Sequence, residues 1–307
     1  MGRRKVRKGC LFVLILIIIA IGAAVAYGKF FSTKDLVPER SVAYRDDRIN
    51  VLVIGTDRGA DSPNDTGRAD SIMVFNLDLK NKKVNALSIP RDSRVEIPGR
   101  ENKTKINHSY AYGGVDLTKE TVENLLGIPI DYYAETNFAG FEQIVDTLGG
   151  VEIDVPIRMK THTYYGDIDL EPGLQTLNGQ EALGFVRYRY DAGGDIARAE
   201  RQQQFLKAVF EKTVSGSNIL KLPELLPQIL EAVDTDFSTT QLITLAKEFR
   251  EINLDTDLHT EVLAGDSETI GGASYWLIDE DAMQETVQRL FIDDYAEPAE
   301  TGQTTEE

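Results

Sequence analysis

The stretch Val51-Leu52-Val53-Ile54-Gly55-Thr56-Asp57-Arg58 decides the fold class of this chain. Four consecutive apolar residues closed by a glycine are typical of a strand that is buried on both faces. Residues 72–79 and 84–89 show two further strand patterns, and Pro90 ends the second of them. Strands of this kind need helices on both sides of their sheet, because neither face can be left in water.

Helical patterns follow these strands along the chain. Asn137 is a suitable N-cap for a helix whose apolar residues recur at helical spacing over 138–148, and Gly149-Gly150 end it. A strand over 151–155, an amphipathic helix over 197–214 and further helices and strands up to residue 291 complete the pattern. We therefore expect an α/β fold in which a central mixed β-sheet is flanked by helices on both faces.

The N-terminal region predicts a membrane anchor. Five basic residues lie within the first eight positions, and an uncharged, mostly apolar run over 9–28 follows them. About 20 apolar residues span the hydrocarbon core of a bilayer, and a basic cluster in front of them keeps the N-terminus cytoplasmic. A cleaved signal peptide is the alternative, because Ala24-Val25-Ala26 has the small-residue form of a cleavage site. The apolar run is longer than the usual core of a signal peptide, which favours the anchor.

These features divide the chain into five parts. We expect a cytoplasmic basic tail over 1–8, a transmembrane signal-anchor over 9–28, a stalk over 29–47, an extracellular folded domain over 48–295 and a disordered acidic tail over 296–307. The protein is therefore expected in the cell membrane as a single-pass protein with its folded domain outside.

Composition excludes several classes of function. The 307 residues include 33 basic and 50 acidic ones, a formal net charge of -17, which argues against nucleic acid as a partner. One cysteine cannot form a disulfide framework or a cysteine-based metal cluster, and three scattered histidines do not make a histidine-rich metal site.

Charged side chains gather where the predicted strands end. Asp57 and Arg58 follow the first strand, Asp70 begins the second, and Arg91 and Asp92 follow the third. Ligands of open α/β sheets bind beyond the carboxyl ends of the strands, so these loops are the first candidates for a site. Each acid-base pair taken singly also fits an ordinary surface salt bridge.

A fourth charged segment covers residues 185–190 and the helix after it. If this segment is extended, Arg187 and Arg189 share one face while Val186, Tyr188 and Tyr190 share the other, although an ordinary half-exposed strand would show the same alternation. Asp195 can cap the next helix, and three side chains of its first turns face one way: Arg198, Arg201 and Gln202.

The combined set suits a pyrophosphate. Guanidinium groups are planar donors that stay charged, so a cluster of them binds phosphates better than it binds one carboxylate. Asp57 and Asp70 are hard oxygen ligands on adjacent loops, and two carboxylates with phosphate oxygens and water suit Mg²⁺. Residues 105–114 are interpreted as loop architecture, with His108 as a hydrogen-bonded polar residue rather than a catalytic one.

Eight motifs in order resemble the LytR-CpsA-Psr family. They are Val-Leu-Val-Ile-Gly-Thr-Asp-Arg (51–58), Arg-Ala-Asp-Ser-Ile-Met (68–73), Leu-Ser-Ile-Pro-Arg-Asp-Ser (87–93), Lys-Ile-Asn (105–107) with Ala-Tyr-Gly-Gly (111–114), Leu-Gly-Gly-Val-Glu-Ile-Asp-Val (148–155), Leu-Asn-Gly-Gln-Glu-Ala-Leu (177–183), Val-Arg-Tyr-Arg (186–189) and Asp-Ile-Ala-Arg-Ala-Glu-Arg-Gln-Gln (195–203). The resemblance covers about residues 48–210. One departure is Ile196-Ala197, where Phe-Gly is common in the family; it changes packing and leaves the charge unaltered.

The resemblance implies roles for individual residues. Asp57 and Asp70 match the positions that hold Mg²⁺ against the substrate, and Asp195, with Asp92 second, is the carboxylate to test as a base. The positions that bind the pyrophosphate are matched by Arg58, Arg91, Arg187, Arg189, Arg198 and, as a polar neighbour, Gln202. Arg91 is also placed among the catalytic residues.

The resemblance further implies a reaction. Members of the family transfer a glycopolymer, such as a teichoic acid or a capsule, from an undecaprenyl-pyrophosphate carrier to peptidoglycan through a phosphodiester, and an apolar groove accepts the polyprenyl chain. A hydrolase that admits water in place of the sugar hydroxyl is the first alternative. A non-enzymatic envelope regulator is the second, but the eight residues before the anchor are too few for a DNA-binding fold.

Overall fold

The computed structural model describes residues 47–57, 67–163, 166–188, 227–249, 252–253 and 256–293, together with the single positions 201, 204, 205, 208, 209 and 212. The predicted basic tail, anchor and acidic tail, and nearly all of the predicted stalk, lie outside these residues. Among the residues described, no helix has the length and apolarity required to cross a bilayer.

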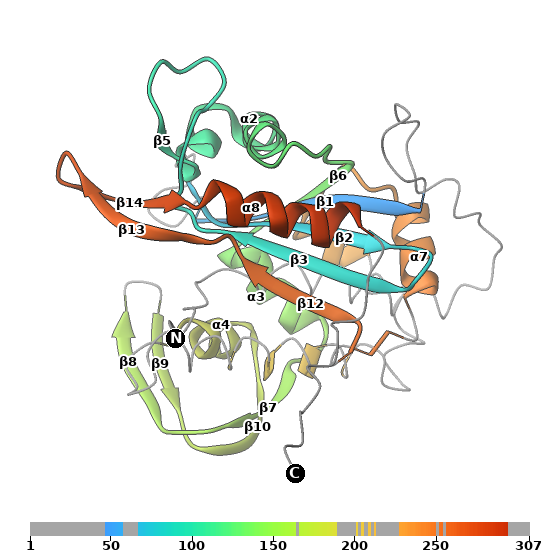
Figure 1. Cartoon of the computed structure of the whole chain (residues 1–307). Coiled ribbons are helices and arrows are strands. Elements are labelled where there is room, and N and C mark those ends of the chain that lie inside the picture. Colours follow the sequence, from blue (N-terminus) through green and yellow to red (C-terminus); the bar gives the residue numbers. More distant parts are fainter. Residues whose placement is uncertain are drawn as a thin grey trace, which may run out of the picture.

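A six-stranded mixed sheet forms the centre of the molecule (Figure 1). Its strands, in spatial order, are β11 (Asp234–Thr235), β6 (Tyr132–Asn137), β1 (Arg48–Thr56), β2 (Ala69–Asp78), β3 (Lys83–Ile89) and β12 (Leu258–Val262). β2 runs antiparallel to both β1 and β3, whereas β6 is parallel to β1 and β12 is parallel to β3. The ends of β1, β3, β6 and β12 and the start of β2 therefore lie at one edge, as the sequence predicted for the first three strands.

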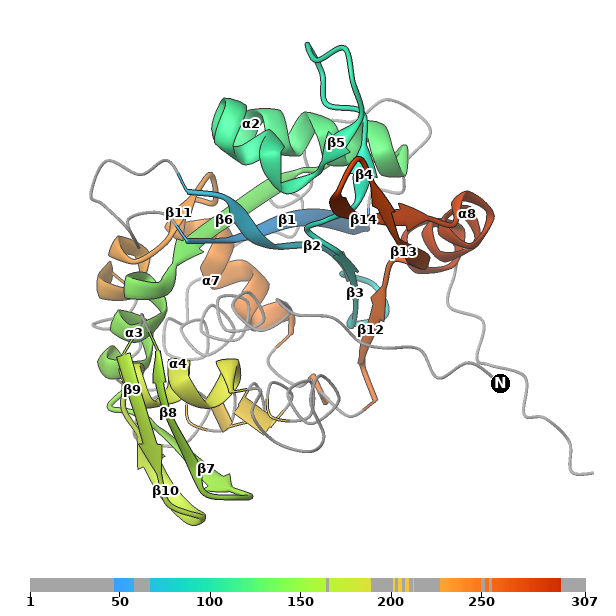
Figure 2. The same ribbon diagram turned by 90° about the vertical axis from the view of Figure 1, so that its left-hand side faces the viewer.

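Both faces of the sheet are covered, which confirms the predicted fold class. Alternate residues of β1 point to opposite sides: Val51 and Val53 belong to one apolar core, and Leu52 and Ile54 to the other. The first core lies against α3 (Phe138–Thr147), α4 (Gly179–Arg187) and α7 (Thr239–Glu248), and the second against α2 (Asn107–Leu126) and α8 (Glu280–Val287) (Figure 2). Every residue of β1 is buried.

The predicted cap of α3 is confirmed. The side chain of Asn137 accepts a hydrogen bond from the Gly140 N–H at 2.9 Å, which satisfies one of the free donors of the first turn. Gly149 and Gly150, with φ of 75° and 78°, end the helix in a conformation that side chains with a Cβ rarely adopt.

Shorter elements surround this centre. Two small antiparallel pairs, β7 (Val151–Val155) with β10 (Gly173–Leu177) and β8 (Met159–Thr163) with β9 (Gly166–Leu170), extend below α4 in Figure 1. At the opposite side lie β4 (Arg94–Val95) with β5 (Thr104–Lys105) and the projecting hairpin of β13 (Gly265–Ile270) and β14 (Ala273–Ile278).

One expected loop is a helix. Residues 107–114, interpreted from sequence as loop architecture, begin α2. Gly113 and Gly114 interrupt the helical dihedral angles, and Gly114 has a φ of 65°, so the helix is kinked there and then continues. The glycine pair that suggested a loop therefore marks a bend inside one element.

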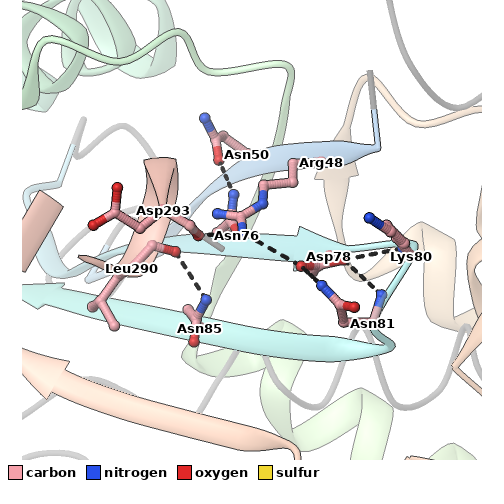
Figure 3. A network of polar contacts seen from close by, with 9 residues as sticks. All are labelled: Arg48, Asn50, Asn76, Asp78, Lys80, Asn81, Asn85, Leu290 and Asp293. Carbon is pink, nitrogen blue, oxygen red and sulfur yellow. Dashed lines mark hydrogen bonds and ion pairs between the residues drawn. The ribbon is translucent and has the colours of Figure 1, made fainter. Parts of the chain in front are cut away.

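A row of buried polar side chains crosses the sheet on the side that faces α8 (Figure 3). Asn76 donates to Asn50 at 2.8 Å, and Asn85 donates to the carbonyl of Leu290 at 2.8 Å. Arg48, which is 3% exposed, donates to the carbonyl of Asp293. Strand β3 is thus tied to the π-helical turn Gln288–Ile292, and the start of β1 to the residue that follows this turn. This row lies at the amino end of β1, away from the edge with the charged loops.

Candidate functional site

The charged loops of β1 and β2 meet at the carboxyl end of β1. Thr56 pairs with Ala69, which places Asp57 directly opposite the start of β2. Two hydrogen bonds hold the Asp57 loop: the Arg68 N–H donates to Asp57 Oδ1 at 2.5 Å, and the Asp57 N–H donates to the Arg68 carbonyl at 3.3 Å. The carboxylate of Asp57 is therefore fixed against the backbone of Arg68, one residue before the start of β2.

Arg91 lies among the carboxylates of this edge. Its guanidinium forms an ion pair with Asp70 and lies 4.0 Å from Asp92. Burial lowers the pKa of Arg91, but the charges of Asp70, Asp92 and Asp57 outweigh that effect and raise it. The Arg91 side chain is still 47% exposed, so a ligand can reach it.

The loop that carries Arg91 and Asp92 is held by its neighbours. The Asn107 N–H donates to the Arg91 carbonyl at 3.2 Å, and the Trp276 N–H donates to the Asp92 carbonyl at 2.9 Å. Lys105 adds a side-chain contact, because its Nζ donates to Asp92 Oδ1 at 2.8 Å. Elements far apart in the chain, the start of α2 and strand β14, thus fix this loop in place.

Lys105 and His108 belong to the site, although the sequence interpretation placed them in loop architecture. His108 accepts or donates a hydrogen bond with Thr104 Oγ1 at 2.9 Å. Burial lowers its pKa, the nearby charges of Arg68 and Lys105 lower it further, and Asp92 acts in the opposite direction. The prediction that His108 is a hydrogen-bonded polar residue is confirmed. Its neighbours, however, include the charged residues Arg68, Lys105 and Asp92 of the candidate site.

The structure corrects the prediction for the segment that contains Arg187. The expected strand over 185–190 is wrong for its described residues, since α4 runs from Gly179 to Arg187. Asn178 and Glu181 form a capping box in which each side chain accepts a hydrogen bond from the backbone N–H of the other, at 3.0 and 2.9 Å. An asparagine followed three residues later by a glutamate before an apolar run is a helix-start signal in the sequence.

Arg187 nevertheless lies near the predicted edge. Its guanidinium carbon is 4.5 Å from the ring centroid of Phe138, the residue after the end of β6. Asn137 pairs with Thr56, so Phe138 and Asp57 follow two paired residues of neighbouring strands. The end of α4 therefore brings Arg187 toward the same sheet edge as Asp57.

The remaining predicted site residues lie outside the described residues: Arg58, Arg189, Asp195, Arg198 and Gln202. The helix predicted over 197–214 is described at six positions, and all six are helical. Phe205 and Val209 are fully buried in it, as their spacing predicted. Arg201 is 3% exposed and donates to the Tyr188 carbonyl at 2.7 Å, which ties this helix to the end of α4.

The donor set at this edge is compatible with a magnesium ion. In the described part of the chain, no group of three or more histidine, cysteine or acidic side chains is placed to bind a metal by itself. Mg²⁺ commonly takes only one or two protein carboxylates and completes its shell with phosphate oxygens and water. Asp57 and Asp70 are the two carboxylates at this edge that would hold such an ion.

Comparison with known proteins agrees with this architecture. The model of the LytR_cpsA_psr family matches residues 22–292. The chain belongs to the LytR-CpsA-Psr family. A curated relative from Bacillus cereus, a polyisoprenyl-teichoic acid–peptidoglycan teichoic acid transferase called TagU, is 34% identical over 79% of this chain and 77% of its own. The TagU of Enterococcus faecalis is 30% identical over 92% of this chain and 94% of its own.

Solved structures of the family have the same fold. TagV from B. subtilis superposes with a TM-score of 0.67 and 34% identity, covering 79% of this chain and 96% of TagV. TagT bound to LI-WTA superposes with a TM-score of 0.60 and 29% identity, covering 87% of this chain and 94% of TagT. The match confirms the resemblance that the eight sequence motifs indicated.

Proposed function

We propose that this LytR-CpsA-Psr protein transfers a glycopolymer from a polyprenyl-pyrophosphate carrier to peptidoglycan through a phosphodiester. The observation that carries the proposal is the ion pair of Arg91 with Asp70 at the sheet edge where Asp57 also lies, with Arg187 over the ring of Phe138 at the end of β6. The relatives named above are transferases of teichoic acid to peptidoglycan, which supports the same reaction class.

The reaction is a displacement at phosphorus. A sugar hydroxyl of the acceptor attacks the phosphorus next to the glycopolymer, a new P–O bond forms, and the bond to the bridging oxygen breaks. Polyprenyl phosphate leaves with the electron pair, and the proton of the hydroxyl goes to a base. Such reactions depend mainly on positioning and on neutralising the phosphate charge, which arginine side chains can do.

Individual side chains have distinct proposed tasks. Arg91 binds a pyrophosphate oxygen, and Arg187 approaches from the end of α4. Among the residues that the structure describes, Asp92 is the candidate base, and its carboxylate is held by Lys105. Mg²⁺, when bound by Asp57 and Asp70, would supply further positive charge to the pyrophosphate. Asp195 remains the first candidate for the base by family resemblance.

The test is covalent attachment of a labelled polymer. Purified protein is incubated with a polyprenyl-pyrophosphate-linked labelled glycopolymer and with isolated peptidoglycan, and label is counted in washed peptidoglycan and in solution. We expect label in the peptidoglycan, and its loss on addition of a chelator and return with Mg²⁺. Release of free polymer without attachment would instead establish the hydrolase.

A double substitution, Asp57→Asn with Asp70→Asn, tests the carboxylates. We expect it to abolish transfer and its response to Mg²⁺ while the protein stays folded. The matched control is Asp169→Asn, an exposed acid that also pairs with an arginine, Arg158, but lies on β9. Unchanged transfer by the double variant would contradict the proposed site.

A further inference from the structure

A surface of aromatic rings and cations extends from the candidate site. Arg100 lies over the ring of Tyr112, with its guanidinium carbon 4.0 Å from the ring centroid, and the ring of His108 is 5.9 Å from that of Tyr112. Thr104 links His108 to β5, and the next residue, Lys105, lies 5.8 Å from the ring of Tyr275. We call this set the aromatic-cationic surface: Arg94, Arg100, Lys105, His108, Tyr112 and Tyr275.

This surface is continuous with the proposed reaction centre. Lys105, which contacts the Tyr275 ring, also donates to Asp92 at 2.8 Å. The hairpin that carries Tyr275 is fixed to the same loop, because the Trp276 N–H donates to the Asp92 carbonyl. The β13–β14 hairpin and β5 lie on one side of the molecule in both views, and Figure 2 shows β4 next to them (Figures 1 and 2). α2 begins two residues after the end of β5.

The rings and cations are open to a ligand. Tyr112 is 46% exposed even with Arg100 over its ring, and Arg100 is itself exposed. Arg94 lies 6.0 Å from the ring of Tyr275. Within the described part of the chain, neither Arg94 nor Arg100 forms an ion pair with a carboxylate, whereas Arg91 does. In an acidic protein, two arginines held by aromatic rings rather than by acids are available to an anionic partner.

We infer that this surface binds the peptidoglycan acceptor, a glycan strand that carries acidic peptide stems. This inference rests on the proposed function, which requires an acceptor next to Asp92. The face of a sugar ring presents C–H groups with partial positive charge, and these pack on the negative face of an aromatic ring. The stems present carboxylates, which guanidinium groups bind as planar donors. Glu268, opposite Tyr275 in β13, adds an acceptor for sugar hydroxyls.

The first experiment measures acceptor binding without the reaction. Peptidoglycan freed of attached polymers is sedimented with the full-length protein or with the double variant Arg100→Ala with Tyr112→Ala. We expect the variant to bind about tenfold more weakly, which is the effect of losing about 1.4 kcal/mol of contacts. The matched control, Arg158→Ala with Leu174→Ala, also removes one exposed arginine and one exposed apolar side chain, but directly before β8 and in β10, and should bind as the wild type does.

A second acceptor distinguishes the contribution of the aromatic rings from that of the arginines. Glycan strands from which an amidase has removed the peptide stems keep the sugars and lose the carboxylates. Tyr112→Ala should weaken binding to both acceptors, whereas Arg100→Gln should weaken binding only to the acceptor that retains its stems. In the transfer reaction, the double variant should raise the KM for peptidoglycan about tenfold and leave the affinity for a polyprenyl pyrophosphate unchanged.

The outcomes distinguish the two proposals. If the double variant binds peptidoglycan as well as the wild type does, the proposed role of the aromatic-cationic surface is refuted. The proposed transfer reaction is not affected by that result. A lower affinity of the double variant for the polyprenyl pyrophosphate would also refute this role, because Arg100 and Tyr112 would then belong to the donor site. Wild-type protein that binds peptidoglycan but attaches nothing would refute the proposed transfer, and the variant's binding would still decide the surface.

Discussion

Replacement of Arg91 by alanine separates a catalytic role from a structural one. The substitution removes the ion pair with Asp70 and the positive charge next to Asp92. Because the side chains of Arg91 and Asp70 are 47% and 32% exposed, the pair should contribute no more than about 1 kcal/mol to stability. For a domain of this size that corresponds to a fall in Tm of about 2–4 °C at most.

The effect on transfer should be much larger. Loss of one hydrogen-bond donor to a developing anionic charge typically lowers kcat about 10²- to 10³-fold. We therefore expect Arg91→Ala to keep its fold and to lose transfer by that factor. Arg91→Lys keeps the charge but loses the planar pair of donors, so it should fall between alanine and the wild type.

The measurements are a thermal melt and an initial rate of polymer attachment at saturating donor. Arg158→Ala is the control, since Arg158 also pairs with an aspartate, Asp169, and the two side chains are 38% and 50% exposed. The control should show an equally small change in Tm and wild-type transfer. A rate for Arg91→Ala within threefold of wild type, with normal folding, would refute the assignment of Arg91 to the site.

Two further predictions test the helix and the histidine. Asn178→Ala should lower the free energy of unfolding by about 1 kcal/mol in urea, because the capping box with Glu181 is lost, whereas Asn178→Asp should be nearly neutral. His108 should titrate below its ordinary pKa of 6.5 when followed by NMR, because burial and the charges of Arg68 and Lys105 disfavour its protonated form. Its contribution to stability is therefore full above pH 6.5 and is lost as the pH falls through the lowered pKa; a midpoint at or above 6.5 would contradict the placement.

The sequence was sufficient to predict three neighbouring strands of the sheet, β1, β2 and β3, but not β6, which pairs with β1 on the other side. Strands β1, β2 and β3 are recognisable because burial on both faces demands apolar runs, which few other elements share. The glycine or proline at or next to the ends of these strands indicated where loops begin, so Asp57, Asp70 and Arg91 could be assigned to one edge. In the structure Arg91 pairs with Asp70 at that edge, and the charge of Asp57 is among those that raise the pKa of Arg91.

The segment around Arg187 could not be assigned by alternation alone. Val186-Arg187-Tyr188 satisfies the two-residue period of a strand, yet a helix ends at Arg187. The decisive signal lies upstream, in Asn178 and Glu181, whose reciprocal hydrogen bonds start the helix. Local pattern at the end of an element is weaker evidence than a capping signal at its beginning.

Other parts of the site depend on contacts that no local pattern contains. Lys105 reaches Asp92, and Trp276 binds the backbone of the same loop, across sequence separations of 13 and 184 residues. Only the completed fold brings α2 and β14 to the end of β3. The sequence motif at 105–107 indicated that this region matters, but only the structure shows that it supports the Arg91 loop.

These backbone contacts explain how the described part of the site can hold its charged side chains in place for a substrate. The carbonyls of Arg91 and Asp92 are bound by N–H groups from α2 and β14, and Asp57 is held by the N–H of Arg68. A loop whose backbone is fixed before the substrate arrives needs little reorganisation when negative charge develops in the transition state. Arg91, by contrast, is held by a carboxylate that a phosphate can replace, because the pair is partly exposed. The backbone is therefore rigid while the guanidinium can exchange one anionic partner for another, as binding of a pyrophosphate requires.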